Sequence, residues 1–487
     1  MMGLIVAYSI YIGIALGLAL AIVFGGALAL DAGTRIRNEP LPWAFVAILL
    51  VIMVSPLATG RILAAGMVTD DATLEEIGAA LWINRFATIG VLALCMERIA
   101  RFFLHKRLQP LHGWGLLLAF VAFAAANLLL SGAFGAKPAF DHKWLYCFIV
   151  YFAFFLVAQD QPDRCLRFAR VALLLFLVGS ALAVLVRPDA VIERNYAGLP
   201  GLKFRYYGLA THANTMGPMA MTALVLLWRY PFRQPAFTIA ATGLAAGSLL
   251  LSQSKTTLVI AVAAMVFLAL YRYYQRVVRN KPGASVQFAL MLWAAGCMAC
   301  AALAIGLLVG VNYMDWALGK LDTITGSQLA SLSGRTRIWA LAWREFTSHP
   351  LFGYGPTIWD PFYRFYAQMP FAPHAHNQLL QSLSSAGAVG GLTLIAYAIT
   401  LTVFALRACA GSGGISVALV GLMLARCISE VPFGTAGILQ SEFFIHLLAL
   451  VTCIGFAPKQ ALAPTVAKLR TGALAPGVRR LASRGSA

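Results

Sequence analysis

The sequence predicts an all-α integral membrane protein built as a bundle of 12 or 13 transmembrane helices. Of its 487 residues, 60% are hydrophobic and only 11% are charged, and the mean hydropathy is +0.79. A soluble domain needs more polar side chains than this to cover its surface. Uncharged stretches close to the roughly 20 residues needed to cross a bilayer also recur along the whole chain. Composition and spacing therefore agree on one helical membrane bundle.

The expected spans follow directly from these stretches, taken in order along the chain. They are 4–30, 41–57, 78–97, 114–134, 144–158, 168–186, 212–228, 236–252, 256–271, 285–311, 386–407, 414–430 and 440–456. The segment 144–158 is short and 4–30 is long for one span, so both totals stay open. The N-terminus has no basic n-region and no small-residue cleavage site, and we expect a retained membrane segment there.

The loop charges predict which loops share a side. The net charge is +19, and in a membrane protein such an excess belongs in short cytoplasmic loops rather than on a nucleic-acid surface. Basic clusters lie at 98–107, 164–170, 229–233 and 272–281, and in the tail after 458. We expect all of these in the cytoplasm. The opposite, outer side then receives 58–77, 135–143, 187–211, 252–256 and 312–385.

This topology divides the chain into four parts. A transmembrane bundle, 1–311, carries the outer loop 187–211, and a large outer loop follows at 312–385. The C-terminal transmembrane helices occupy 386–457, and a basic cytoplasmic tail occupies 458–487. Within the large loop, Thr336–Ser348 has the pattern of an amphipathic helix, which we expect to lie at the bilayer interface on Trp339, Leu341, Trp343 and Phe346. The eight cysteines avoid the long polar loops, so we expect no disulfides.

Cations on the outer side are the first candidates for function, because that side should be poor in them. The loop 187–211 carries Arg187, Arg194, Lys203 and Arg205, and the large loop carries Arg335, Arg337, Arg344 and Arg364. The guanidinium group fits phosphate oxygens in bidentate fashion. Lys255 lies between two spans near membrane depth, where an ionisable group is a functional candidate. Any one of these side chains could instead bind lipid headgroups.

A second candidate group is the run Pro373-His374-Ala375-His376-Asn377. A histidine of ordinary pKa is largely neutral at pH 7 and can take a proton from a hydroxyl, while Asn377 could orient a substrate. Gly387 and Gly390 would let another backbone approach the next helix closely. No neighbouring Asp, Glu or Cys completes a ligand set around the two histidines, so we expect no metal and no cofactor.

Several motifs of known enzyme classes are missing from the sequence, and their absence limits the reactions that the chain could catalyse. The chain has no P-loop, dinucleotide fingerprint, HExxH or Gly-x-Ser-x-Gly, and no Asp-x-Asp in an outer loop. Its spans are poor in the carboxylates that proton-coupled transporters need. A metal-independent reaction on a lipid diphosphate fits what remains, because such a leaving group departs as a stabilised anion.

The chain resembles the bacterial O-antigen ligases of the O-antigen ligase/polymerase superfamily. His376-Asn377, nine residues, Gly387, two residues and Gly390 match the superfamily's histidine motif. The run Ser333-Gly334-Arg335 with Trp339, and the run His349 to Gly355, are similar to the loop that precedes that motif. The segment Arg205 to Gly208, with His212-Ala213-Asn214 and Gly217, is similar to the middle region.

The resemblance implies a periplasmic glycosyl transfer at the bacterial inner membrane. The donor would be O-antigen on undecaprenyl diphosphate, and the acceptor would be the lipid A core. His376 would be the general base of an inverting reaction, and Arg205, with Arg335 or Arg337 and help from Lys255, would bind the diphosphate. Asn377, His374 and His212 would orient the substrates. Membrane lipids are the other expected partners; nucleic acid is not.

Three other functions stay open. An O-antigen polymerase would use the same donor with a growing glycan as acceptor. A protein O-oligosaccharyltransferase usually has more C-terminal sequence. A polysaccharide flippase or other transporter would fit the spans and basic loops, but it would not need the His376 motif, and the chain shows no internal repeat.

Overall fold

The computed structural model describes residues 40–63, 79–104, 111–194, 196, 202–279, 335–369 and 372–458. One compact unit, Met1–Ala457, contains every helix and strand described below, and the second unit is Pro458–Ala487. The spans expected at 4–30 and 285–311, and nearly all of the tail expected at 458–487, lie outside the described residues. So do Cys297 and Cys300 and the first part of the large loop.

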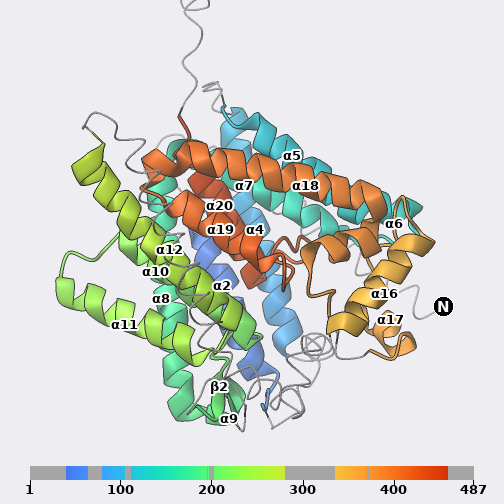
Figure 1. Ribbon diagram of the computed structural model, residues 1–487, viewed down its shortest axis with the longest axis horizontal. Helices are drawn as coiled ribbons and strands as arrows, with labels where there is room; N and C mark the ends of the chain where they lie inside the picture. The colour runs from blue at the N-terminus through green and yellow to red at the C-terminus, as the bar shows by residue number, and fades with distance from the viewer. Residues whose placement is uncertain are drawn as a thin grey trace, which may run out of the picture. The chain divides into compact units, whose positions relative to one another are not determined.

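The described chain is mostly helical (Figure 1). Its longer helices are α2 (Trp43–Ala58), α4 (Ala79–Leu104), α5 (Trp114–Ala124), α7 (Tyr146–Asp160), α8 (Pro162–Val186), α10 (Ala213–Arg229), α11 (Pro235–Leu251), α12 (Lys255–Tyr273), α16 (Arg335–Ser348), α18 (Gln378–Ser412), α19 (Ile415–Arg426) and α20 (Ser441–Gly455). Short elements join them: α6 (Ser131–Phe134), α9 (Pro188–Val191), α17 (Pro361–Tyr366), and the antiparallel pair β1 (Ile192–Arg194) and β2 (Phe204–Tyr206).

The predicted class, an all-α membrane protein, is confirmed. Five helical segments are long and apolar enough to cross a membrane: Trp114–Phe134, His142–Asp160, Pro162–Val186, Lys255–Val278 and Gln378–Ser412. Four apolar helices are shorter, namely α2, α11, α19 and α20. Each of these nine segments overlaps an expected span. The total of 12 or 13 stays a prediction, because the described residues do not cover the chain.

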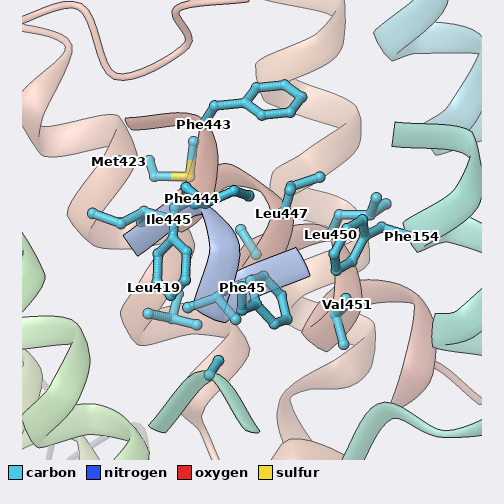
Figure 2. Packing of buried hydrophobic residues seen from close by; sticks show 14 of the residues in the cluster. Phe45, Phe154, Leu419, Met423, Phe443, Phe444, Ile445, Leu447, Leu450 and Val451 are labelled. Carbon is cyan, nitrogen blue, oxygen red and sulfur yellow. The ribbon is translucent and has the colours of Figure 1, made fainter. Parts of the chain in front are cut away.

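The core of the bundle is formed where α2, α7, α8, α18 and α19 pack against α20, and Figure 2 shows buried side chains of α2, α7, α19 and α20 within it. Almost every side chain of α20 from Phe443 to Ile454 is buried. Phe45 of α2 contacts Phe154 of α7 and Phe444 of α20, with ring centroids 4.8 and 5.1 Å apart. A helix that is apolar on all sides can be covered by lipid or by other helices, and the burial of these side chains shows that other helices cover α20. The six cysteines in the described residues are free, as expected.

Contacts between loops agree with the grouping that the charges predict. Among the loops expected outside, the Lys137 N–H donates to the Tyr354 carbonyl oxygen at 2.8 Å. Arg61 donates to the Ala210 carbonyl oxygen at 2.6 Å. At the other end of the helices, Arg272 of one basic loop donates to the Trp228 carbonyl oxygen at 2.9 Å. Each of these contacts joins segments that the charges place at the same end of the helices, and the grouping of the remaining loops stays a prediction. Which compartment each group faces stays a prediction.

Helix α16 forms where the amphipathic pattern predicts it, but its buried face differs from the expected one. Ile338, Leu341 and Ala342 are buried against a small separate core that includes Ile358 and Tyr363 of the same loop. Leu341, one of the four residues expected against the bilayer, is thus covered by protein, whereas Trp343 is 53% exposed and its contact with the bilayer stays a prediction. The helix therefore has a partner within the protein, in contact with α18.

Helix α18 begins at Gln378, before the expected span at 386, and it is bent at Gly387. The backbone there has φ +62° and ψ −157°, which is not helical. The N–H groups of Ala388 and Val389, which lose their helical partners, donate to the carbonyl oxygens of Pro350 and Leu351 at 2.7 and 3.2 Å. A Cβ on Gly387 would collide with the Leu351 carbonyl group. The close approach expected at this glycine is therefore present.

Candidate active site

The carboxylate of Glu430 is the centre of a polar cluster that joins several distant segments. Its Oε2 atom lies 3.3 Å from Nδ1 of His376 and 3.7 Å from Nε2 of His374. Its Oε1 atom accepts hydrogen bonds from Arg335 at 3.2 Å and from the side-chain amide of Asn214 at 2.9 Å. The carboxylate is 12% exposed. Both oxygens of one buried acid are therefore used to arrange other side chains.

These contacts fix the proton on each neutral imidazole. A carboxylate only accepts, so the proton of His376 is on Nδ1, toward Glu430, and Nε2 keeps its lone pair. No described residue forms a hydrogen bond with that Nε2 atom. In His374 the reverse holds, because its Nδ1 accepts from the His376 N–H at 3.1 Å. His376 is thus the imidazole that can act as a base.

Of the two arginines near the start of α16, one contacts the cluster and the other does not. Arg335, at the first residue of α16, pairs with Glu430, whereas Arg337 is exposed two residues later. Successive helical residues turn by about 100°, so positions i and i+2 point to different faces. Within the described chain no ion pair of Arg337 is found. The sequence left Arg335 and Arg337 open as alternatives for the site. The geometry favours Arg335.

Arg205 joins the cluster through Asn214. Its guanidinium donates to the Asn214 side-chain oxygen, and its Nε donates to the Ser252 carbonyl oxygen at 3.1 Å. The guanidinium carbon also lies 4.8 Å from the centre of the Tyr196 ring. The strand pair β1–β2 holds Arg205 opposite Glu193. Arg205 and His376, which are 171 positions apart in the sequence, are thus linked through Asn214 and Glu430.

The turn before α18 places His376. Asn377 caps the helix, since its Oδ1 accepts from the Leu380 N–H at 3.0 Å, and its Nδ2 donates to the Ile428 carbonyl oxygen at 3.3 Å. His376 itself has φ +48°, a left-handed conformation that is uncommon outside glycine. Such backbone outliers are found preferentially at functional sites, where neighbouring contacts hold them.

The remaining predicted residues lie beside the cluster. His212 caps α10, and its Nδ1 accepts from the Asn214 N–H at 3.0 Å. Lys255 is exposed at the first residue of α12, and it forms no hydrogen bond or ion pair with Glu430 within the described residues. Its neighbour Thr256 has its hydroxyl 3.5 Å from that of Ser429. Lys255 therefore lies at the edge of the cluster rather than within it.

Three other arginines of the loops expected outside contact residues that are not part of the cluster or are buried in their own helix. Arg194 pairs with Asp189 at 3.1 Å, and Arg344 pairs with Glu345 at 3.5 Å. Arg364 is buried within α17. Of the outer arginines within the described residues, Arg205 and Arg335 are the two that contact the cluster.

The surroundings set the charge of the acid and of two histidines. Burial raises the pKa of Glu430, but the hydrogen bond from His376 and the positive charges of its neighbours outweigh burial and leave that pKa well below its usual range. Burial and the charge of Arg205 lower the pKa of His212 to about 3. Burial and His376 lower the pKa of His374 to about 3. At neutral pH the site therefore holds one carboxylate beside neutral His212 and His374.

Glu430 corrects the expectation that no acid stands near the two histidines. His374, His376 and Glu430 each offer an atom within 4.8 Å of the others, so the three could hold a cation. The guanidinium of Arg335 on the same carboxylate opposes a second positive charge there. A hydrogen-bonded histidine–glutamate pair accounts for the geometry without one.

The sequence contains a signal for Glu430 that was missed. The expected span 414–430 placed this residue inside the membrane, whereas α19 ends at Arg426. Pro432 disfavours helix in the residue before it, and an ionisable side chain near a span end is a functional candidate. Asn214 gave no comparable signal beyond its place in the middle region of the resemblance.

Comparison with known proteins gives one family. A family model described as "O-Antigen ligase" matches residues 240–395, about a third of the chain. The matched range includes Lys255, Arg335, His374 and His376, while Glu430 lies beyond it. The comparison with curated proteins gave no match.

Proposed function

We propose that this chain, which its match over 240–395 assigns to the O-antigen ligase type, transfers an O-antigen polysaccharide from undecaprenyl diphosphate to the lipid A core. The family consists of membrane enzymes that act on polysaccharides carried by lipids. The observation that carries the finer proposal is the hydrogen-bonded series from His376 through Glu430 to Arg335, and through Asn214 to Arg205. This series supports the proposal because it joins the proposed base to two guanidinium groups of the kind that bind phosphate.

In the proposed reaction His376 is the general base. Its Nε2 atom takes the proton of the acceptor hydroxyl as that oxygen attacks the anomeric carbon of the donor sugar. The bond between that carbon and the phosphate oxygen breaks, and the polyprenyl diphosphate leaves with the electron pair. Attack from the opposite face inverts the configuration. The carboxylate of Glu430 keeps the imidazole oriented and stabilises the imidazolium that forms.

Arg205 and Arg335 would bind the diphosphate and offset the charge that grows on it as the bond breaks. Both guanidinium groups are held by hydrogen bonds before the donor arrives, so little reorganisation is needed. Lys255, exposed at the edge of the cluster, would attract the anionic donor. His212, His374 and Asn377 hold neighbouring atoms of the site and would act on the substrates through His376 and Asn214. We place this reaction on the periplasmic face of the inner membrane.

The test is reconstitution of the full chain in lipid with a glycan-loaded polyprenyl diphosphate and two acceptors, lipid A core and the lipid-linked glycan itself. Glycan on lipid A core, with release of polyprenyl diphosphate, supports the ligase. Elongation of the lipid-linked glycan alone would identify a polymerase instead. Movement of the donor across the bilayer without transfer would identify a transporter. The transfer is expected to continue in EDTA; inhibition that Mg²⁺ reverses would refute the metal-independent reaction.

A further inference from the structure

We propose that Asn214 is a positioning residue that couples the two halves of the site, the carboxylate that orients the base and the arginine that binds the diphosphate. The inference rests on the proposed function and assigns a role to a residue that the sequence indicated only by its place in the middle region of the resemblance. Asn214 lies in the first turn of α10, where His212 is the cap. It is half-buried between β2 and the loop that follows α19.

Both the nitrogen and the oxygen of the Asn214 side-chain amide form hydrogen bonds within the site. Its Nδ2 donates to Oε1 of Glu430 at 2.9 Å, and its Oδ1 accepts from the guanidinium of Arg205. Arginine has only donors and an ionised glutamate has only acceptors, so this orientation of the amide is the one that satisfies both. An aspartate here would repel Glu430, and an apolar side chain would leave both charged groups without this partner.

The backbone of Asn214 is held as firmly as its side chain. Its N–H donates to Nδ1 of His212 at 3.0 Å, and its carbonyl oxygen accepts from Arg426 at 3.4 Å. Arg426 also accepts, through its own carbonyl oxygen, the N–H of Glu430 at 2.7 Å. The residue that bridges Arg205 to Glu430 is therefore fixed to the same short loop that carries Glu430.

This arrangement implies a coupling between donor binding and the base. Any movement of the Arg205 guanidinium toward a phosphate pulls on the amide oxygen, and the amide passes the displacement to the carboxylate that orients His376. A misplacement of about 1 Å between reacting groups costs on the order of 10²-fold in rate. Loss of Asn214 should therefore reduce turnover even though Asn214 touches neither substrate.

The experiment compares Asn214→Ala, Asn214→Asp, Glu430→Gln and the double swap Asn214→Asp/Glu430→Gln, in the full chain with both acceptors. In the swap, the new amide can donate to the new carboxylate, which still accepts from Arg205. We expect Asn214→Ala and Asn214→Asp each to lose roughly 10- to 100-fold in transfer rate. The swap still lacks the counter-charge of Glu430 beside His376, so we expect it to be at least about tenfold more active than the combined losses of Asn214→Asp and Glu430→Gln would give, rather than as active as the parent. Each rate is divided by that of the parent. The inference would be overturned if the relative rate of the swap were no higher than the product of the relative rates of Asn214→Asp and Glu430→Gln.

The pH profile separates positioning from simple loss of folding. In Asn214→Asp two carboxylates face one another, and like charges this close share a proton as the pH falls. The activity of that variant relative to the parent should be higher at pH 5.5 than at pH 8, whereas the ratio for Asn214→Ala should not change. Equal ratios in both variants would count against the coupling. The charged or titratable groups that face Asn214 and Glu430 are Arg205, His212, Arg335, His374, His376 and Arg426, with Glu442 next to Arg426.

A matched control is Thr215→Val, one residue further along α10. Thr215 is buried and its hydroxyl lies 3.5 Å from Glu442 rather than Glu430. We expect it to keep the parent's transfer rate, and membrane level and unfolding temperature are measured for every variant. A parent that transfers to neither acceptor would refute the proposed function. A parent that transfers while Asn214→Ala matches it would refute the coupling alone.

Discussion

Nδ1 of His376 lies 3.3 Å from Oε2 of Glu430, and a backbone of positive φ at His376 holds it there. The pair comes from segments on either side of α18 and α19, so the fold rather than the local sequence creates it. Its consequence is an imidazole whose second nitrogen is left with a lone pair.

Glu430→Gln keeps the shape of the side chain and removes its charge. The imidazolium formed during the reaction then loses its counter-charge, and we expect the turnover number to fall on the order of 10²-fold or more. Glu345→Gln is the matched control, because Glu345 is similarly buried, at 14% exposure against 12%, and lies on α16 beside Arg344. Equal activities of the two variants in the reconstituted assay would contradict the role of Glu430.

His376→Ala removes the base and should lower transfer by roughly 10²- to 10⁴-fold, with the protein still inserted in the membrane. His142→Ala serves as its control, since His142 lies in the expected outer loop 135–143 and pairs with Asp141 at 3.4 Å. Product on lipid A core is measured in both variants. Normal transfer by His376→Ala would remove this residue from the mechanism.

Arg335→Ala and Arg337→Ala should differ although the two residues are on the same helix. Arg335 pairs with Glu430 while Arg337 is exposed. Loss of a hydrogen-bonded charge should raise the KM for the lipid diphosphate by roughly 10- to 100-fold in Arg335→Ala, and Arg337→Ala should stay near the parent. If Arg337→Ala shows the larger change, the assignment of the two arginines is reversed.

Acid should weaken the fold through His212. Its pKa is about 3 in the folded protein, against about 6.5 in an unfolded chain. The unfolded chain therefore takes up a proton below about pH 6.5 that the folded protein refuses, and stability falls as the pH drops from there toward 3. His212→Asn keeps a capping acceptor without titrating. It should lose less in unfolding temperature between pH 7 and pH 5 than the parent; identical losses would show that His212 does not contribute.

Gly387→Ala should destabilise the protein, because the position has φ +62° and a Cβ would meet the Leu351 carbonyl group. The strain of such a conformation costs about 1–3 kcal/mol before the collision is counted. Gly243→Ala in α11 is the control: its Cβ meets nothing within 4 Å, and alanine favours helix there. Unfolding temperatures in detergent compare the two. A Gly387→Ala variant as stable as Gly243→Ala would contradict the tight approach.

Hydropathy predicted the helices well because a span must be both long and apolar. The span expected at 236–252, for example, is α11, Pro235–Leu251. The amphipathic pattern placed α16 within one residue of its start at Arg335. The pattern could not show which face of α16 is covered, since the residues that cover it, such as Trp359, come from a loop without periodicity.

The site was predictable in part. His376 and Arg205 each stood out by residue type and place in the sequence. Their connection did not, because Asn214 and Glu430 are ordinary polar residues until the helices that carry them pack together. Glu430 was hidden by a span drawn four residues beyond the end of α19 at Arg426. Errors of this size at helix ends are normal, and here the error covered the acid itself.

The cluster around Glu430 takes one member from each of several segments spread between 205 and 430. During synthesis the base and both arginines emerge well before the acid that joins them. A growing chain that has not yet reached Glu430 therefore lacks the carboxylate that orients the proposed base. Under the proposed reaction, such a half-made protein would use few lipid carriers before α19 and the loop after it are in place.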